Sequence, residues 1–143
     1  MVNKPYRIYV HHSASKDTTT VEDITAWHKA RRFKTIGYHA VIHRLAPTKD
    51  HPEGEVVVSP GRPETVIGAH TLNYNNNSLG VCCAGNYSIT EMAEDTYQVL
   101  LDHVRGWMKK YNIPSSEVRG HREVAATACP GTLFDLDKFR ADL

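Results

Sequence analysis

Alternation of apolar and polar side chains marks the N-terminal end of the chain. Tyr6, Ile8 and Val10 occupy every second position over residues 6–12, which predicts a β-strand. The run SLGVCCAG is apolar almost without interruption, as expected for a strand in the middle of a sheet covered on both faces. Further short strands are predicted over residues 37–44, 55–60 and 117–121.

Helical periodicity is clearest over residues 89–114. Apolar side chains recur there at intervals of three and four, which places them on one face of a helix. The stripe consists of Tyr97, Leu100, Leu101, Val104, Trp107, Met108 and Tyr111. Ser88 or Thr90 is expected to cap the start of this helix, and Pro114 limits its continuation.

Two shorter helices complete the pattern. Residues 21–33 have helical spacing, and Thr20 with Asp23 resembles a capping box at their start. A last helix is predicted over residues 134–143. Strands and helices follow one another without a linker, repeat or low-complexity tract. Residues 1–143 are therefore expected to form a single α/β domain, a mostly buried central sheet with helices on its faces.

Composition and charge exclude several classes of function. Hydrophobic residues make up 41% of the chain, charged residues 23%, and the net charge is +1, so nothing indicates a nucleic-acid partner. The densest basic patch, KARRFK at residues 29–34, is interpreted as a solvated helix face, with weak attraction to anionic surfaces as the alternative. The sequence contains no membrane span and no secretory signal at its N-terminus, so synthesis in a cytoplasm is expected.

Histidines and one cysteine carry the candidate chemistry. His11, His12, His39, His70 and His121 all fall at or just after strand ends, where open α/β sheets gather their ligands. The three cysteines do not suggest a disulfide framework, since two are adjacent and lie in the apolar strand. The third, in the run TACPG, is expected on a loop, where a thiol can act.

These residues alone leave three interpretations open. Two imidazoles and a thiolate can hold Zn²⁺ with a fourth position free for catalysis. The same groups can form a thiol nucleophile with a histidine base. Their grouping can also be coincidence, since a histidine at a strand end is often structural, and neither a C-x-x-C nor an H-E-x-x-H motif occurs.

Four motifs resemble, in order, those of zinc-dependent N-acetylmuramoyl-L-alanine amidases: IYVHHSAS, GYHAVIHR, IGAHTLNYNNNSLGVCCAGNY and VRGHREVAATACPG. The resemblance covers nearly the whole chain. It is to the superfamily of type 2 amidases and peptidoglycan-recognition proteins, and especially to short phage amidase lysozymes. It implies that superfamily's fold with a central mixed sheet, a Zn²⁺ cofactor, and hydrolysis of the amide between N-acetylmuramic acid and L-alanine in peptidoglycan.

The resemblance also implies site residues. The zinc ligands correspond to His11, rather than His12, together with His121 and Cys129. Tyr38 is implied as the catalytic residue that polarises the attacking water or the oxyanion. The residues implied to contact the substrate are His39, His70 and, more weakly, Asn75.

Two positions depart from the family pattern. Phage relatives often have a lysine two residues before the ligand cysteine, where this chain has Thr127. A hydroxyl at Thr127 can donate to an oxyanion but brings no positive charge, so its catalytic contribution is open. Residues 45–55 are longer than the usual turn; they either fold over the groove or form a tolerated surface loop. Glu123 either orients a zinc ligand or caps the turn that follows His121.

Three other functions are compatible with these residues. One is a module that binds peptidoglycan without cleaving it, and another is a cysteine hydrolase built on Cys129 with His121 or His39 as its base. The third is a cytoplasmic amidase that recycles muropeptides. Cys129 argues against the first, whose members typically lose this ligand, and against the third, whose members tend to use aspartate. The expected role is a monomeric phage endolysin, made in the host cytoplasm without inserting into the membrane, that degrades the cell wall after the membrane is breached.

Overall fold

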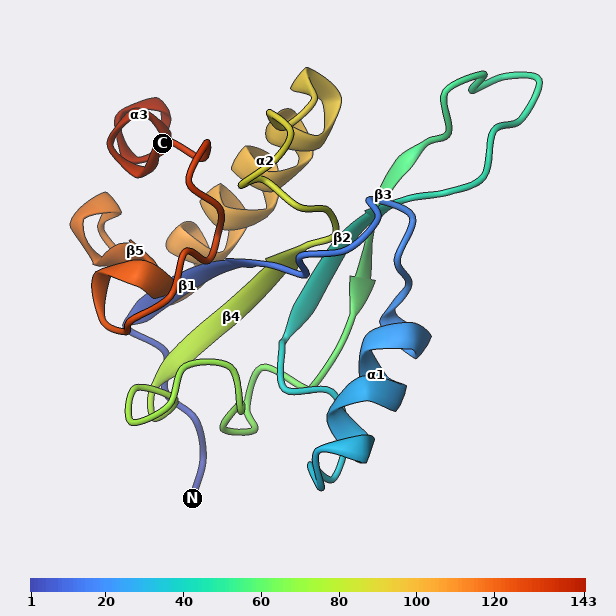
Figure 1. Cartoon of the computed structure of the whole chain (residues 1–143). Coiled ribbons are helices and arrows are strands. Elements are labelled where there is room, and N and C mark those ends of the chain that lie inside the picture. The colour runs from blue at the N-terminus through green and yellow to red at the C-terminus, as the bar shows by residue number, and fades with distance from the viewer.

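The computed structural model describes residues 1–143 and contains one five-stranded sheet. Its strands lie in the order β3-β2-β4-β1-β5, so β4 is central (Figure 1). The pairings of β1 with β4, β1 with β5 and β2 with β4 are parallel, and only β2 and β3 are antiparallel. The strands are β1 (Arg7–His12), β2 (Ala40–Arg44), β3 (Val56–Pro60), β4 (Ser78–Cys83) and β5 (Val118–Gly120).

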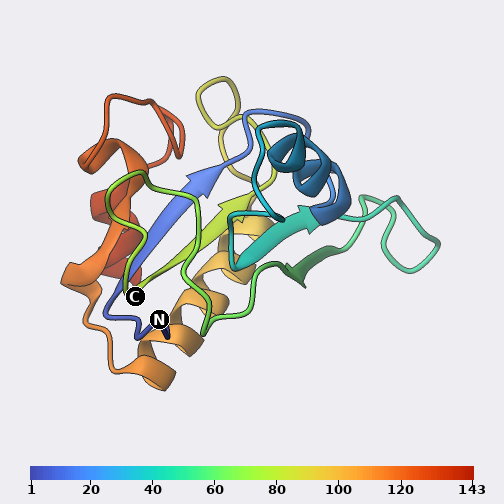
Figure 2. The same ribbon diagram turned by 90° about the horizontal axis from the view of Figure 1, so that it is seen from below.

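Helices cover both faces of this sheet. They are α1 (Val21–Ala30), α2 (Glu94–Tyr111) and α3 (Leu136–Asp142). Figure 2 shows α1 and the segment joining β3 to β4 in front of the sheet, and α2 behind it. The side covered by α1 is called the front face below, and the side covered by α2 and α3 the back face. This architecture confirms the predicted α/β fold with a mixed central sheet between helices.

The two faces carry apolar cores of very different size. The back core contains 17 buried residues and packs α2 and α3 against β1, β2, β4 and β5. The front core contains only Ile24, Ile36, Val41 and Cys82. Strand β4 is buried along its whole length, as its unbroken apolar run predicts. Cys82 belongs to the front core and Cys83 to the back core, and both are free thiols.

Helix α1 begins as the sequence predicts but ends earlier. The Thr20 hydroxyl accepts from the Asp23 backbone N–H at 3.1 Å, and the Asp23 carboxylate accepts from the Thr20 N–H at 3.0 Å. This reciprocal pair confirms the predicted capping box. The helix ends at Ala30 rather than at residue 33, because the chain turns at Arg32, whose φ of 70° is left-handed.

The expected caps of the long helix were wrong. Helix α2 begins only at Glu94, and its N-cap, Ala93, has no capping side chain. The Ser88 hydroxyl is too far upstream and instead accepts from the backbone N–H of Thr132 at 3.1 Å. Acidic Glu94 and Asp95 in the first turn compensate electrostatically, because they lie at the positive end of the helix dipole.

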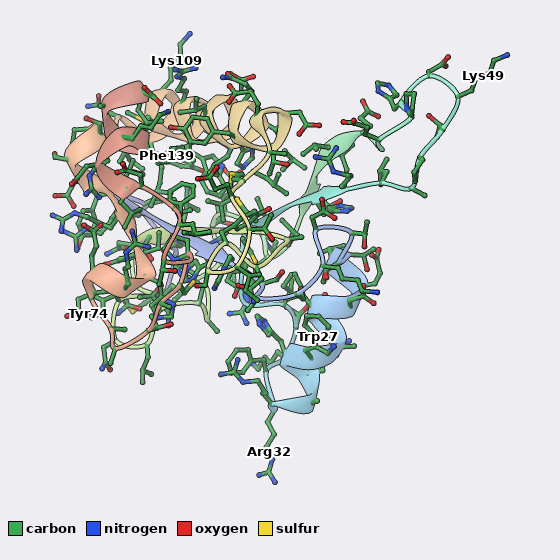
Figure 3. The ribbon with its side chains drawn as sticks, turned by 45° about the horizontal axis from the view of Figure 1, so that its top comes forward. Trp27, Arg32, Lys49, Tyr74, Lys109 and Phe139 are labelled. Atoms are coloured by element: carbon green, nitrogen blue, oxygen red, sulfur yellow. The ribbon has the colours of Figure 1, made fainter.

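The long loop between β2 and β3 projects away from the sheet and its helices. Figure 1 shows it extending beyond the end of the hairpin, and Figure 3 places Lys49 near its tip. Arg44 anchors its base, donating to the Gly54 carbonyl at 2.8 Å and to the Asp95 carboxylate at 2.8 Å. This position favours the surface-loop interpretation of residues 45–55. No helix of the structure is long and apolar enough to span a membrane.

Candidate metal centre

The candidate ligands gather where parallel strands end. Val10 of β1 pairs with Gly120 of β5, so the residues that follow them, His11 and His121, emerge side by side. His121 opens a short 3-10 helix immediately after β5. Cys129 reaches the same place from the loop that follows this helix. The gathering of side chains at the carboxyl ends of parallel strands is the arrangement expected of an open α/β sheet.

The three side chains fit a metal ion. One ligand atom from each of His11, His121 and Cys129 lies within 4.8 Å of the others. His11 Nδ1 is 3.6 Å from Cys129 Sγ, and the rings of His11 and His121 are 4.8 Å apart. His11 and Cys129 are buried, whereas His121 is partly exposed. Two imidazole nitrogens and one sulfur suit Zn²⁺, and three protein ligands leave a fourth position open.

Burial shifts the pKa values of all three candidate ligands, His11, His121 and Cys129. It lowers the pKa of His11 well below its usual value, with further lowering from neighbouring His70 and His121, and it also lowers the pKa of His121. Both rings are thus neutral and present a lone pair. Burial raises the pKa of the Cys129 thiol to about 11, against a smaller opposing effect of the His12 backbone N–H. A divalent cation would favour the thiolate and displace the thiol proton.

Backbone contacts fix the cysteine. The His12 N–H donates to Cys129 Sγ at 3.3 Å, and the Arg122 N–H donates to the Cys129 carbonyl at 2.8 Å. The Thr127 hydroxyl accepts from the Cys129 N–H at 3.2 Å. Thr127 is exposed beside the cluster, so its proposed help to an oxyanion stays a prediction, while its present contact shapes the cysteine turn.

The second nitrogen of His11 is held from the opposite side. His11 Nε2 lies 3.1 Å from His70 Nδ1 and 3.2 Å from Thr71 Oγ1, and these two atoms are 2.8 Å apart. With Nε2 donating into this pair, Nδ1 is the nitrogen that faces Cys129. Such a partner on the far nitrogen fixes both the tautomer and the orientation of a ligating ring.

Asn75 fixes the backbone of His70 and Thr71, the two residues that contact His11 Nε2. Its side-chain oxygen accepts from the backbone N–H groups of both His70 and Thr71, each at 2.8 Å. The family resemblance implies that His70 and Asn75 contact the substrate, and that role stays a prediction. The sequence does not indicate a role for Thr71, because no local motif identifies a threonine whose partner, His11, is 60 positions away in the chain.

His39 is buried next to His70, and the centres of the two rings are 5.6 Å apart. It is only 3% exposed, its Nε2 bonds to the Val66 carbonyl at 2.8 Å, and its Nδ1 accepts from the Gly80 N–H at 3.0 Å. Gly80 has no room for a side chain, because a Cβ there would meet the His70 ring at 2.5 Å. Substrate contact by His39 stays a prediction; its nitrogens already have partners within the protein.

Tyr38 lies beside the cluster on the front face. Its ring centre is 5.1 Å from that of His11 and 5.3 Å from that of His28. Burial raises the pKa of Tyr38 well above its usual value, and the nearby Cys82 and Cys129 thiols raise it further. The phenol therefore stays protonated and keeps a hydrogen to donate. Tyr38 also lines a small hollow next to α1, described below.

Glu123 has a structural role. One carboxylate oxygen accepts from the Gly120 N–H at 2.9 Å, and the carboxylate forms an ion pair with Arg140 at 2.8 Å. These contacts confirm the capping interpretation and tie α3 to the turn that begins with His121. His12, the alternative to His11, is not in the cluster; its Nδ1 accepts instead from the Tyr87 N–H at 3.2 Å.

Fold and site together define a class of protein. A mixed-sheet α/β domain that presents two imidazoles and a thiol around an open position has the construction of metal-dependent hydrolases. A family model described as N-acetylmuramoyl-L-alanine amidase matches residues 1–132. The chain belongs to the N-acetylmuramoyl-L-alanine amidase family.

Individual relatives agree with this assignment. The endolysin of Escherichia phage T7 is 33% identical over 144 residues, covering 92% of this chain and 83% of the relative. The solved amidase LysC from Clostridium intestinale URNW has a TM-score of 0.81 at 29% identity, covering 96% of this chain and 84% of that one. A mutant of Drosophila PGRP-LB in complex with tracheal cytotoxin has a TM-score of 0.71 at 27% identity, covering 92% and 77%.

Proposed function

We propose that this protein is a zinc-dependent amidase that hydrolyses the amide joining N-acetylmuramic acid to L-alanine in peptidoglycan. The observation that carries the proposal is the convergence of His11, His121 and Cys129 in a chain of the amidase family. Their neutral nitrogens and sulfur are the donor set that zinc hydrolases use, with one position left open.

Different residues of the chain have different roles in the proposed hydrolysis. Zn²⁺ held by these three side chains would supply Lewis acidity and a water of lowered pKa. Tyr38, kept protonated by burial, donates a hydrogen bond to the oxyanion that develops on the scissile carbonyl and can pass a proton to the leaving amine of L-alanine. Thr127 is the second candidate donor. His70 and Thr71 hold His11 in position throughout.

A chelation experiment tests the proposal. The purified chain is incubated with peptidoglycan, and new L-alanine amino termini are counted before chelation, after chelation and after addition of Zn²⁺. The expected result is activity that disappears with the chelator and returns with zinc. Activity that persists in a metal-free sample, together with loss on thiol alkylation, would support the cysteine hydrolase instead. That alternative is disfavoured by the raised pKa of Cys129, which keeps the thiol protonated without a cation.

The similarity to phage endolysins supports a role in host lysis. The relative from phage T7 is named an endolysin, and the fold also occurs in a recognition protein that binds tracheal cytotoxin. We infer that the chain acts as a monomer on peptidoglycan, from the side of the host cytoplasm, once the membrane is breached. Added from outside, it is expected to lyse cells with a permeabilised outer membrane and leave intact cells unchanged.

A further inference from the structure

A small hollow lies on the front face between α1 and the candidate metal centre. Its volume is about 160 Å³, and its lining residues are Ser13, Ile24, Trp27, His28, Arg31 and Tyr38. Because the Tyr38 ring is also 5.1 Å from the His11 ring, the hollow adjoins the place where the scissile amide must lie. It is called the Tyr38 hollow below.

The Tyr38 hollow is small, and its lining is divided evenly between apolar and polar side chains. Ile24 is buried beneath it, whereas Trp27 is 48% exposed, an unusual state for an indole. Figure 3 shows Trp27 on α1. Sites for whole drug-sized ligands usually have volumes of about 300–1,000 Å³, so this hollow can receive only a small part of a substrate.

The Arg31 side chain, which lines the Tyr38 hollow, has no acidic partner. None of the ion pairs in the protein involves Arg31 or the other basic residues at the end of α1, Lys29, Arg32 and Lys34. The Arg31 guanidinium packs over the Phe33 ring, 5.0 Å from its centre, which restricts its orientation. Of the four basic side chains, only that of Arg31 lines the Tyr38 hollow.

We propose that Arg31, with Trp27, forms a subsite on the leaving-group side of the scissile amide that recognises a stem peptide with a free carboxylate. This inference rests on the proposed amidase function. The hollow receives the alanyl methyl group, and the guanidinium pairs with the α-carboxylate of the γ-linked glutamyl residue that follows. Only the alanyl residue, which spans at most ~3.6 Å, separates the scissile amide from this glutamyl residue, so the glutamyl carboxylate lies close to the Tyr38 hollow.

The chemistry predicts a preference between two stem peptides that differ in one group. In some walls the glutamyl carboxylate is free, and in others it is amidated. A guanidinium binds the carboxylate bidentately with charge assistance but gains much less from the neutral amide. The enzyme should therefore prefer the free acid, and the preference should reside in KM because the pairing is already made in the ground state.

The test compares N-acetylmuramoyl-L-alanyl-D-isoglutamate with N-acetylmuramoyl-L-alanyl-D-isoglutamine as substrates. We expect Arg31→Gln to raise KM for the acid about tenfold with kcat unchanged, and to leave KM for the amide within about twofold. Arg31→Lys should restore part of the preference. Arg32→Gln is the matched control. Arg32 is adjacent to Arg31 in the chain and carries the same charge, but its side chain points into solvent (Figure 3). This substitution should change neither KM.

Each other outcome has a definite meaning. Equal losses on acid and amide, no loss on either, or the same effect from Arg32→Gln would overturn the carboxylate subsite while leaving the amidase function intact. Failure of the wild-type chain to release L-alanine amino termini from peptidoglycan, measured alongside, would instead refute the proposed function. Thermal unfolding of each variant is measured alongside; a lowered midpoint for Arg31→Gln, with KM raised equally for both substrates, would mark a structural role and contradict the inference.

Discussion

The two faces of the sheet are built from the same strands but carry different side chains. Behind the sheet, 17 buried residues form a continuous apolar core under α2 and α3. In front of it the apolar core has four members, and the rest of that face is occupied by histidines, Tyr38 and the hollow beside α1. Alternation along β1 makes the division: Ile8 and Val10 point backwards into the core, while Tyr9 and His11 point forwards.

The residues expected to contribute most to stability therefore lie on the back face, and those expected to contribute to activity lie on the front face. Buried polar groups cost free energy unless they are hydrogen-bonded; on the front face His11 Nε2 and both nitrogens of His39 are bonded within the protein, whereas His70 Nε2 has no partner. The back face buries most of the apolar surface and so supplies most of the folding free energy. Changes in front should therefore remove activity at little cost in stability, and changes behind should do the reverse.

The largest expected effect lies in front. Cys129→Ala or His121→Ala removes one of three ligands, and activity on peptidoglycan should fall by about 10³-fold or more, as when a member of a catalytic unit is lost. The release of L-alanine amino termini measures this loss. Unfolding of the metal-free variants should match that of the metal-free wild type. A variant that keeps near wild-type activity would remove its residue from the site.

The corresponding change behind the sheet is Leu100→Ala. Leu100 is fully buried in the back core, so a cavity there should cost about 2–5 kcal/mol of unfolding free energy, measured with urea. Activity per folded molecule should be unchanged at low temperature. Leu72→Ala, at a site 81% exposed, is the control and should have little effect on stability. A fall in kcat with Leu100→Ala would show that the two faces are coupled.

The back face was largely predictable from sequence, for a physical reason. A periodicity of three to four identified the buried stripe of α2, and an almost unbroken apolar run identified β4 as a strand buried on both faces. The start of α2 was not predictable in the same way. Several polar residues precede the helix, and tertiary packing rather than local capping sets its first residue, as the contact of Ser88 with Thr132 shows.

Prediction of the site residues on the front face depended on the family resemblance. Alternation alone could not choose between His11 and His12, because both are histidines at the end of one strand. The structure separates them, since His11 joins His121 and Cys129 whereas His12 accepts a bond from Tyr87. The sequence did not indicate Thr71, which contacts His11, or Arg31 of the proposed carboxylate subsite. Their importance depends on neighbours brought together by the fold, which a single sequence does not reveal.

A smaller effect should follow from weakening the support of His11. Thr71→Val keeps the shape of the side chain but removes the hydroxyl that contacts His11 Nε2 at 3.2 Å. Loss of such a partner typically weakens metal binding about 10–100-fold. Competition with a chromophoric chelator measures the affinity without any substrate. The matched control is Thr96→Val, the same change on the back face, which should leave zinc affinity unaltered. Equal affinity in both variants would contradict the supporting role of Thr71.

Glu64 links the two faces and should respond to pH. It lies in the segment that leads to the front-face His70, yet its carboxylate accepts from Trp107, Lys110 and Tyr111 of α2. Burial alone would raise the pKa of Glu64, but these hydrogen bonds outweigh burial and hold the pKa below its usual value. Its contribution to stability is therefore present above the unfolded pKa of about 4.3 and is lost as pH falls through the lower folded pKa.

Glu64→Gln should cost about 1 kcal/mol at pH 7, and the difference from wild type should shrink as the pH is lowered toward 3. Urea unfolding at several pH values measures it. Glu53→Gln, in the exposed loop, removes the same charge and should have no such effect. A difference that stays constant with pH would mean that Glu64 acts through packing rather than through its charge.

The smallest effect is expected at the projecting loop, which belongs to neither face. The hydrogen bonds around its tip are local, joining Thr48 to His51 and His51 to Gly54. Replacing residues 47–52 with a two-residue Asn-Gly turn, while keeping Arg44 and Gly54, should change the unfolding free energy by less than about 0.5 kcal/mol. Turnover on both soluble muropeptides and intact peptidoglycan should also be unchanged, because the loop around Lys49 extends away from Trp27, which lines the Tyr38 hollow (Figure 3). Loss of turnover on intact peptidoglycan alone would show that the loop contacts the polymer beyond the cleft.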